Sequence, residues 1–287
     1  MTRTPELFSP HAQAPLGNLY QAISEDVRYG HYVRIPERIC RCLDYFKVSF
    51  CRESVAERLR SYYLFIGVVD DAIDSGEPEV GREILRRLGG AEDPSFDKET
   101  GLSCAGLATE VLKRHISPES RASMLSKLEE LYEAVLRERT SETLAAYVEQ
   151  RRAVGRLTAE LSYLLIRPLL GTERAAALRR FLEKVGAVGC LVDSVIDLRA
   201  DARQGLLSFS PTVGEHLRLV FETVREGFAL SLRHPRLCAL FLEAVSDDVF
   251  DRLRARRKKA RPSFEGEHLV GRSYEYECAA RGGANHG

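Results

Sequence analysis

The sequence predicts an all-α protein that forms a single-domain helical bundle. Apolar residues recur at spacings of three and four between helix-capping signals, and no segment shows the alternation between hairpin dipeptides that is typical of strands. The 287 residues are 44% hydrophobic and 29% charged, a composition that excludes collagen-like and largely disordered proteins. We expect an N-terminal extension over residues 1–17, the helical domain over 18–276 and a disordered tail over 277–287.

Capping residues predict where the helices begin and end. Ser54-Val-Ala-Glu57 has the form of a capping box and opens a helix that runs to about Asp74. Ser117-Pro118 begins a helix that runs to about Arg139, because proline is tolerated at the first helical position. Further helices are expected over about 140–167, from Thr172 to about Arg203, and after Pro211 and Pro235, with a loop-like segment and a short helix over 76–104. Gly205 suits the left-handed position that ends the longest of them.

Charge and apolar runs limit the classes of partner. Lys plus Arg (42) balances Asp plus Glu (42), so we expect no nucleic-acid partner. No apolar run is long enough for a membrane span and residues 1–17 lack the apolar block of a secretory signal, which predicts a cytoplasmic protein. The seven cysteines lack paired zinc spacing, so most are expected to be reduced thiols. Two further alternatives stay open. The chain could form a homodimer, and the basic run 252–261 could contact a membrane surface instead of being an exposed helix face only.

Three aspartates end an otherwise apolar helix. Asp70, Asp71 and Asp74 follow the run 62–69 and have no Lys or Arg beside them in the sequence. Their charges repel one another, and the helix dipole disfavours anions near a helix C-terminus. A bound divalent cation would reverse this balance, and oxygen ligands suit Mg²⁺, which also takes substrate phosphate oxygens. The alternative is a solvated, frayed helix end.

A second set of aspartates recurs at every fourth residue of a later helix, at Asp193, Asp197 and Asp201. Each step of four residues advances by ~40° around a helix, so the three side chains form one acidic stripe. Val192 and Ile196 flank the stripe, so part of it is expected to lie near the core, where buried charge needs partners.

The two acidic helices resemble the motifs of class I trans-type isoprenoid synthases. The first reads Asp-Asp-x-x-Asp. The second, from Asp197 to Gly205, resembles the Asp-x-x-x-Asp-Ala-Arg-x-Gly motif of the squalene/phytoene synthase branch, with Asp193 in the place of an Asn. The same ladder is also similar to the magnesium triad of class I terpene cyclases, and Tyr63 matches a tyrosine of the family. The resemblance covers residues 54–205 and implies a helical bundle of the isoprenoid (terpenoid) synthase type.

The sequence departs from the squalene/phytoene branch at two diphosphate-binding arginines. Gly67 and Ile196 stand where that branch has arginine, and the basic clusters that bind isopentenyl diphosphate are missing, which disfavours a chain-elongating enzyme. Bacterial terpene cyclases have a diphosphate-sensing arginine and a helix-break glycine at the place of the run Tyr147-x-x-x-Arg151-Arg152-x-x-Gly155. They also have an Arg-Tyr pair at the place of Arg272-Ser-Tyr274.

The resemblance implies a Mg²⁺-dependent class I terpene synthase that ionises an allylic prenyl diphosphate (C15 or C20), cyclises or rearranges the cation and releases diphosphate. A squalene/phytoene synthase-type head-to-head prenyltransferase is the runner-up, and a non-enzymatic helical scaffold is the third alternative. Catalytic roles are expected for Asp70, Asp197, Arg151 and Tyr147. Mg²⁺ is expected at Asp70, Asp71, Asp74, Asp193, Asp197 and Asp201. Substrate contacts are expected from Tyr63, Phe65, Arg151, Arg152, Arg203, Arg272 and Tyr274, with core packing the alternative for each aromatic side chain.

Overall fold

In the computed structural model the described part of the chain is all-helical, which confirms the predicted fold class. The structure describes residues 29–74, 78–90, 104–171 and 175–235, together with 21, 24, 25, 239, 242, 243 and 246. All of them belong to one compact unit within residues 1–248. A search of these residues for a helix long and apolar enough to cross a membrane found none.

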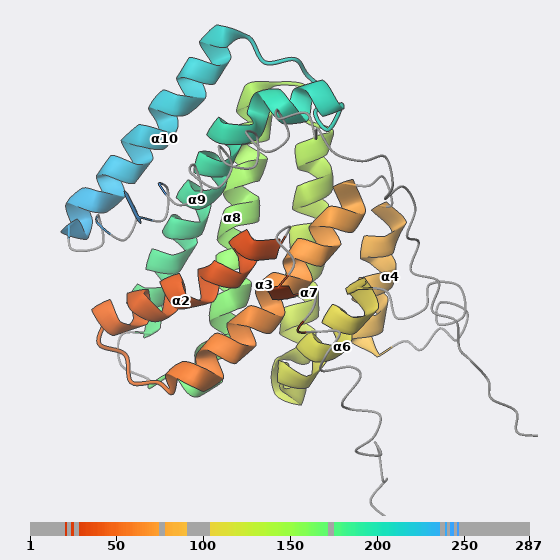
Figure 1. The fold of residues 1–287 in the computed structure, drawn as a ribbon, viewed down its shortest axis with the longest axis vertical. Coiled ribbons are helices and arrows are strands. Elements are labelled where there is room, and N and C mark those ends of the chain that lie inside the picture. Colours follow the sequence, from red (N-terminus) through yellow and green to blue (C-terminus); the bar gives the residue numbers. More distant parts are fainter. Residues whose placement is uncertain are drawn as a thin grey trace, which may run out of the picture. The chain divides into compact units, whose positions relative to one another are not determined.

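Eight α-helices make up the described fold (Figure 1). They are α2 (Gly30–Tyr45), α3 (Arg52–Asp74), α4 (Pro78–Gly89), α6 (Cys104–His115), α7 (Pro118–Arg139), α8 (Leu144–Ile166), α9 (Ala175–Gln204) and α10 (Val213–Arg233). A short 3₁₀ helix, Arg167–Leu169, follows α8. The described residues contain one isolated β-bridge, between Phe50 and Leu170, and no longer strand.

Several helix ends form as their capping residues predict. Ser117 caps α7, with its hydroxyl accepting a hydrogen bond from the Ser120 amide, and proline occupies the first turn. Gly205 ends α9 with φ of 75°, the left-handed conformation that glycine adopts without strain. Thr212 and Glu215 form a reciprocal capping box at the start of α10, one residue after the proline from which that helix was predicted.

Other ends differ from the prediction. The capping box expected at Ser54 is wrong, because α3 begins at Arg52 and the Ser54 hydroxyl donates to Sγ of Cys51 instead. No helix was predicted over α2, which contains Pro36 in its interior, and α8 begins after the cap Thr143 rather than at residue 140. The N-terminal extension expected over 1–17 and the tail expected over 277–287 lie outside the described residues, as does most of the helix expected after Pro235.

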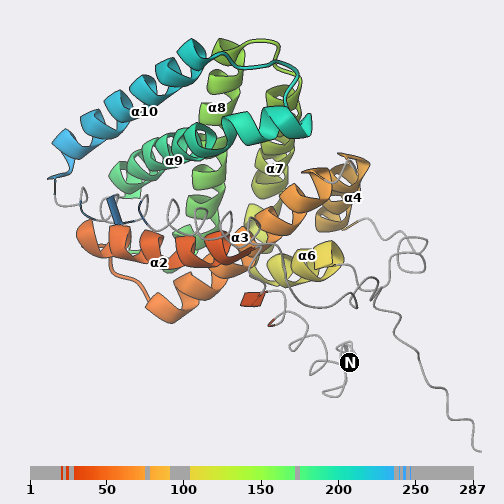
Figure 2. The same cartoon turned by 45° about the horizontal axis from the view of Figure 1, so that its top comes forward.

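The antiparallel pair α8 and α9 forms the centre of the bundle. α7 and α3 pack against α8, α2 packs against α3, and α10 packs against α9 (Figures 1 and 2). The pair touches backbone to backbone at two glycines: a Cβ atom on Gly155 would lie 2.2 Å from the carbonyl oxygen of Gly186. α8 and α9 therefore approach more closely than side chains would permit.

The apolar core lies among these helices and includes the middle of α3. Tyr62, Leu64 and Phe65 are at most 2% exposed and form part of one large buried cluster. A smaller cluster at the other end of the α8–α9 pair includes Tyr147 and Leu198. Helices of this bundle are held mainly by burial of apolar surface, the largest favourable contribution to folding.

Candidate functional site

Two tyrosines from the start of α2 hold the acidic end of α3. The hydroxyl of Tyr32 donates a hydrogen bond to Asp70 over 2.9 Å, and the hydroxyl of Tyr29 donates to Asp71 over 3.1 Å. Asp70 is half-buried and Asp71 is exposed. Asp74 is the last residue of α3, and its side chain is not among those that the structure describes. The hydroxyls give these carboxylates hydrogen-bond donors that their neighbours in the sequence do not supply.

Gly67 makes room for Tyr32. A Cβ atom at residue 67 would lie 2.6 Å from Cδ2 of the Tyr32 ring, closer than two carbon atoms approach without displacement. Burial raises the pKa of the Tyr32 hydroxyl well above its ordinary value, and the charges of Asp70 and Asp193 raise it further. A neutral hydroxyl donor from α2 therefore reaches Asp70, which follows Gly67 by three residues on α3.

The carboxylates of α9 are half-buried and face α8 at both ends of the stripe. Asp193 accepts a hydrogen bond from Nη2 of Arg151 over 2.9 Å. Burial is the main cause that raises the pKa of the Tyr147 hydroxyl to about 12, and the charge of Asp201 contributes to the rise. Asp197 lies between these two aspartates and is half-buried as well.

The guanidinium of Arg151 is the centre of a buried polar cluster between α7, α8 and α9. It donates to Glu138 (3.2 Å), Asp193 (2.9 Å), the carbonyl of Cys190 (3.3 Å) and the hydroxyl of Ser194 (2.9 Å), which also accepts from the hydroxyl of Tyr147 (3.1 Å). We call Arg151, Glu138, Tyr147, Asp193 and Ser194 the Arg151 cluster. Burial by itself would lower the pKa of Arg151, but Glu138 and the other anionic groups outweigh it and raise the pKa well above its ordinary value. Arg151 is therefore a permanent cation in this cluster.

Asp70 of α3 and Asp193 of α9 both lie near Glu138 of the Arg151 cluster. Burial is the main cause that raises the pKa of Glu138, and Asp70 from α3 and Asp193 from α9 raise it further against the opposing effect of Arg151. The same two aspartates raise the pKa of Tyr32. Their charges act on the same buried groups, so Asp70 and Asp193 lie around one polar centre although 123 residues of sequence separate their positions.

The other predicted arginines lie elsewhere. Arg152 pairs with Glu222 over 3.1 Å and with Glu226, both on α10, so it points away from the Arg151 cluster. Arg203 is exposed, and its Nε donates to the carbonyl of Arg199 on its own helix. Arg272 and Tyr274 lie outside the described residues. Of the two neighbouring arginines on α8, the structure brings Arg151 to the aspartates.

The predicted aromatic contacts belong to the core between α3 and α8. The hydroxyl of Tyr63 accepts a hydrogen bond from Ser162 over 2.9 Å, and the hydroxyl of Tyr62 donates to the Thr158 carbonyl over 3.2 Å. Phe65 is 2% exposed. Of these, Tyr63 and Phe65 lie within two turns of Asp70 along α3.

The carboxylates are suitable donors for Mg²⁺. Among the described residues, no group of three or more His, Cys, Asp or Glu side chains is gathered closely enough to hold a metal ion. Mg²⁺ usually takes one or two carboxylates and completes its coordination with water and phosphate oxygens. Asp70 with Asp71, and Asp193 with Asp197, offer such small sets on the two helices. Mg²⁺ binding stays a prediction.

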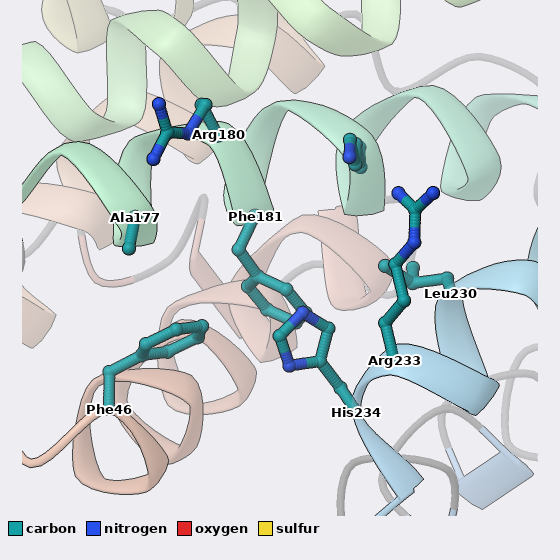
Figure 3. A pocket seen from close by; sticks show the side chains of 8 residues that line it. Phe46, Ala177, Arg180, Phe181, Leu230, Arg233 and His234 are labelled. Carbon is teal, nitrogen blue, oxygen red and sulfur yellow. The ribbon is translucent and has the colours of Figure 1, made fainter.

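A separate pocket of about 170 Å³ lies where α2, α9 and α10 meet (Figure 3). Three rings and three cations line it: Phe46, Phe181 and His234, and Arg180, Lys184 and Arg233. The ring centroids are 4.9–5.8 Å apart, so the rings pack against one another. The pocket belongs to the N-terminal half of α9, whereas the aspartates lie in its C-terminal half, so it is not part of the acidic site.

Four residues of the site could not be recognised as functional from the sequence motifs: Tyr29, Tyr32, Glu138 and Ser194. Ser194 adjoins Asp193 and lies one turn from Cys190, so helical spacing would have placed it toward α8. The sequence alone would not have distinguished Arg151 from Arg152, because they lie four and three residues before Gly155 and both spacings bring side chains to one face of a helix. Tyr32 and Glu138 carry no local signal, since their roles arise from packing between distant segments.

Comparisons of the chain with protein-family models, with curated proteins and with solved structures found no match.

Proposed function

We propose that the chain is a Mg²⁺-dependent class I terpene synthase that ionises an allylic prenyl diphosphate of C15 or C20 length and lets the cation cyclise or rearrange. The observation that supports this most is that Asp70 of α3 accepts from Tyr32 and Asp193 of α9 accepts from Arg151, while both carboxylates act on the same buried groups. An arginine flanked by carboxylates, beside an apolar core, combines a place for diphosphate with surroundings that exclude water.

Ionisation breaks the bond between the allylic carbon and the diphosphate oxygen, and the electron pair leaves with diphosphate. Bound Mg²⁺, held by the aspartates of α3 and α9, would supply Lewis-acid chemistry at the phosphate oxygens. Arg151 adds charge-assisted donors to the leaving group when its contact with Asp193 opens. Tyr147 and Arg151 share Ser194 as acceptor, which keeps the guanidinium beside α9.

The allylic cation ends by losing a proton or by capturing water, so the product is a hydrocarbon or an alcohol. Tyr63 and Phe65 would offer ring faces to the cation, an interaction that stabilises positive charge in a dry site. Both side chains are buried on α3 within two turns of Asp70. Their substitution is expected to change the product more than the release of diphosphate.

The second candidate is a head-to-head prenyltransferase of the squalene/phytoene type. The run from Asp197 to Gly205 favours it, because it keeps the spacing of that branch. The glycine at residue 67 favours the cyclase, because the hydroxyl of Tyr32 rather than an arginine accompanies Asp70. Product length separates the two: one-substrate C15 or C20 products support the cyclase, and C30 or C40 products support coupling.

Diphosphate release from farnesyl and geranylgeranyl diphosphate, with and without Mg²⁺, tests the proposal. Asp70→Asn and Asp197→Asn are each expected to abolish Mg²⁺-dependent release, because each removes a carboxylate from one of the two helices. Asp44→Asn is the matched control, since Asp44 is an exposed aspartate of α2 that pairs with Arg52. Release by this control should equal that of the natural chain.

Two outcomes would contradict the proposal. Release that is insensitive to both aspartate variants would mean that the acidic helices are not the catalytic site. No release from either substrate by the folded chain, together with no Mg²⁺-dependent rise in Tm in the presence of diphosphate, would favour the helical scaffold, because a ligand stabilises only a state that it binds.

A further inference from the structure

α10 presents an apolar stripe to the outside of the described fold. Six of its side chains are between 63% and 67% exposed: Val213, Leu217, Phe221, Val224, Phe228 and Leu232. They follow one another at steps of four, four, three, four and four residues, so they lie on one face of the helix. We call these six residues the outer stripe. Figures 1 and 2 show α10 along the outer side of α9.

The outer stripe is not the face by which α10 joins the bundle. Leu219, Thr223 and Leu230 are buried and form the opposite side of the helix, toward α9. α10 therefore has two apolar faces, of which one is packed and one is unpacked in the described part of the chain. Single exposed apolar residues are ordinary on protein surfaces, but a continuous row of six marks an interaction site.

The charges beside the outer stripe are positive. Arg218, 71% exposed in its side chain, and Arg225, also exposed, lie along one border of the stripe. The three carboxylates of α10 have other partners: Glu215 completes the capping box with Thr212, and Glu222 and Glu226 pair with Arg152. Arg218 also pairs with Glu222, which is half-buried, over 3.2 Å, so part of its charge is matched and Arg225 carries the rest of the charge at this border.

We propose that the outer stripe docks on the surface of an anionic lipid bilayer. A helix with aromatic and aliphatic side chains on one face and arginines at its border lies in the plane of a membrane interface. Phe221 and Phe228 enter the boundary of the acyl chains, while Arg218 and Arg225 extend to the lipid phosphates. The inner face stays packed on α9 through Leu219 and Leu230, which keeps the helix on the surface of the bilayer instead of across it.

A second copy of the chain fits the outer stripe less well. A second α10 would cover the apolar side chains but would offer no further carboxylate to Arg225, because its Glu215, Glu222 and Glu226 are engaged with Thr212, Arg218 and Arg152. Acidic lipid phosphates supply the missing negative charge at the border. This charge complementarity selects the bilayer, and it does not depend on the proposed catalytic activity.

Co-sedimentation of the full chain with lipid vesicles tests the proposal. The vesicles contain phosphatidylcholine with or without phosphatidylserine, and binding is expected only when phosphatidylserine is present. Phe221→Ser with Phe228→Ser is expected to weaken binding at least about tenfold through lost apolar burial. Arg218→Gln with Arg225→Gln is expected to weaken it by about tenfold or more, since each cation near an anionic surface contributes about 1 kcal/mol.

The control is Arg60→Gln with Arg156→Gln, which removes the same charge from exposed positions on α3 and α8. It should bind as the natural chain does, and all variants should keep the natural Tm because their side chains are exposed. The proposal is overturned if the folded natural chain does not bind acidic vesicles. Binding that survives both α10 variants also overturns it, as does a dimer that the phenylalanine variant dissociates without any vesicle binding.

Discussion

Replacing Gly155 by alanine is expected to separate α8 from α9. The added Cβ would lie 2.2 Å from the carbonyl oxygen of Gly186, 2.6 Å from its carbonyl carbon and 2.9 Å from Cα of Ala187. All three are backbone atoms, which cannot turn away as a flexible side chain can. Ordinary contact between such atoms lies near 3.5 Å, so the helices must move apart by roughly 1 Å.

The expected cost follows from two opposing contributions. Inserting a methyl group into a packed interior typically costs about 1–3 kcal/mol, and occasionally more. Alanine is favoured over glycine in a helix by up to about 1 kcal/mol, which offsets part of this cost. Because the contact is with backbone atoms on both helices, we expect the upper part of the range, a net loss of about 2 kcal/mol. For a chain of this size that corresponds to a Tm lower by roughly 4–8 °C.

Gly189→Ala is the matched control, since it changes the same residue type within α9. Nothing lies within 4 Å of its added Cβ and the residue is exposed, so the variant is expected to gain about 0.5–1 kcal/mol. Urea unfolding followed by circular dichroism measures both free energies. A Gly155→Ala chain as stable as the natural one would refute the role of the glycine contact, as would equal effects of the two substitutions.

Three further predictions concern single side chains. Tyr32→Phe removes the hydroxyl that donates to Asp70 and is expected to lower the free energy of unfolding in urea by about 1 kcal/mol. It is also expected to raise the Mg²⁺ concentration needed for diphosphate release. An unchanged Mg²⁺ requirement would contradict the role given to this hydroxyl. Arg151→Gln leaves Glu138 and Asp193 without their cation and is expected to lower the free energy of unfolding by about 3 kcal/mol or more. Arg152→Gln changes the more exposed pair with α10 and is expected to lower it by about 1 kcal/mol. The reverse order would be inconsistent with the Arg151 cluster. Burial lowers the pKa of His234 in the folded chain, so the unfolded state binds more protons than the folded state as the pH falls below about 6.5, and the free energy of unfolding decreases there. His234→Phe keeps an aromatic ring and should lose less stability than the natural chain between neutral and mildly acidic pH. Identical pH profiles of the two chains would disprove this linkage.

Local signals predicted most of the described helices, because caps and glycines act within one turn. Ser117-Pro118 and Gly205 satisfy backbone groups of their own helix ends, so their effect does not depend on the rest of the fold. α2 was not predicted, since it begins at a glycine and contains Pro36, both unfavourable in a helix by propensity alone. Its burial of Ile39 and Leu43 against the core outweighs these local preferences.

The candidate site was predictable only in part. The spacing of the aspartates on α3 and α9 was visible in the sequence, and the structure brings Asp70 and Asp193 to the same buried groups. Glu138 and Tyr32 could not be predicted as members, because their contribution depends on how α7 and α2 pack against other helices. The glycine at residue 67 is explained by the structure alone, because the ring of Tyr32 occupies the space that a side chain at this position would need.

The contact between Gly155 and Gly186 also decides which of two adjacent arginines meets the aspartates. Gly155 must face α9, which fixes the rotation of α8 about its own axis. Around the helix, Arg151 lies about 40° to one side of Gly155 and meets Asp193 on α9, whereas Arg152 lies about 60° to the other side and meets Glu226 on α10. A rotation of α8 by about 100° would bring Arg152 to the present direction of Arg151 and carry Arg151 away from Asp193. Two glycines, by setting the rotation of α8, thus determine which arginine places its positive charge beside Asp193.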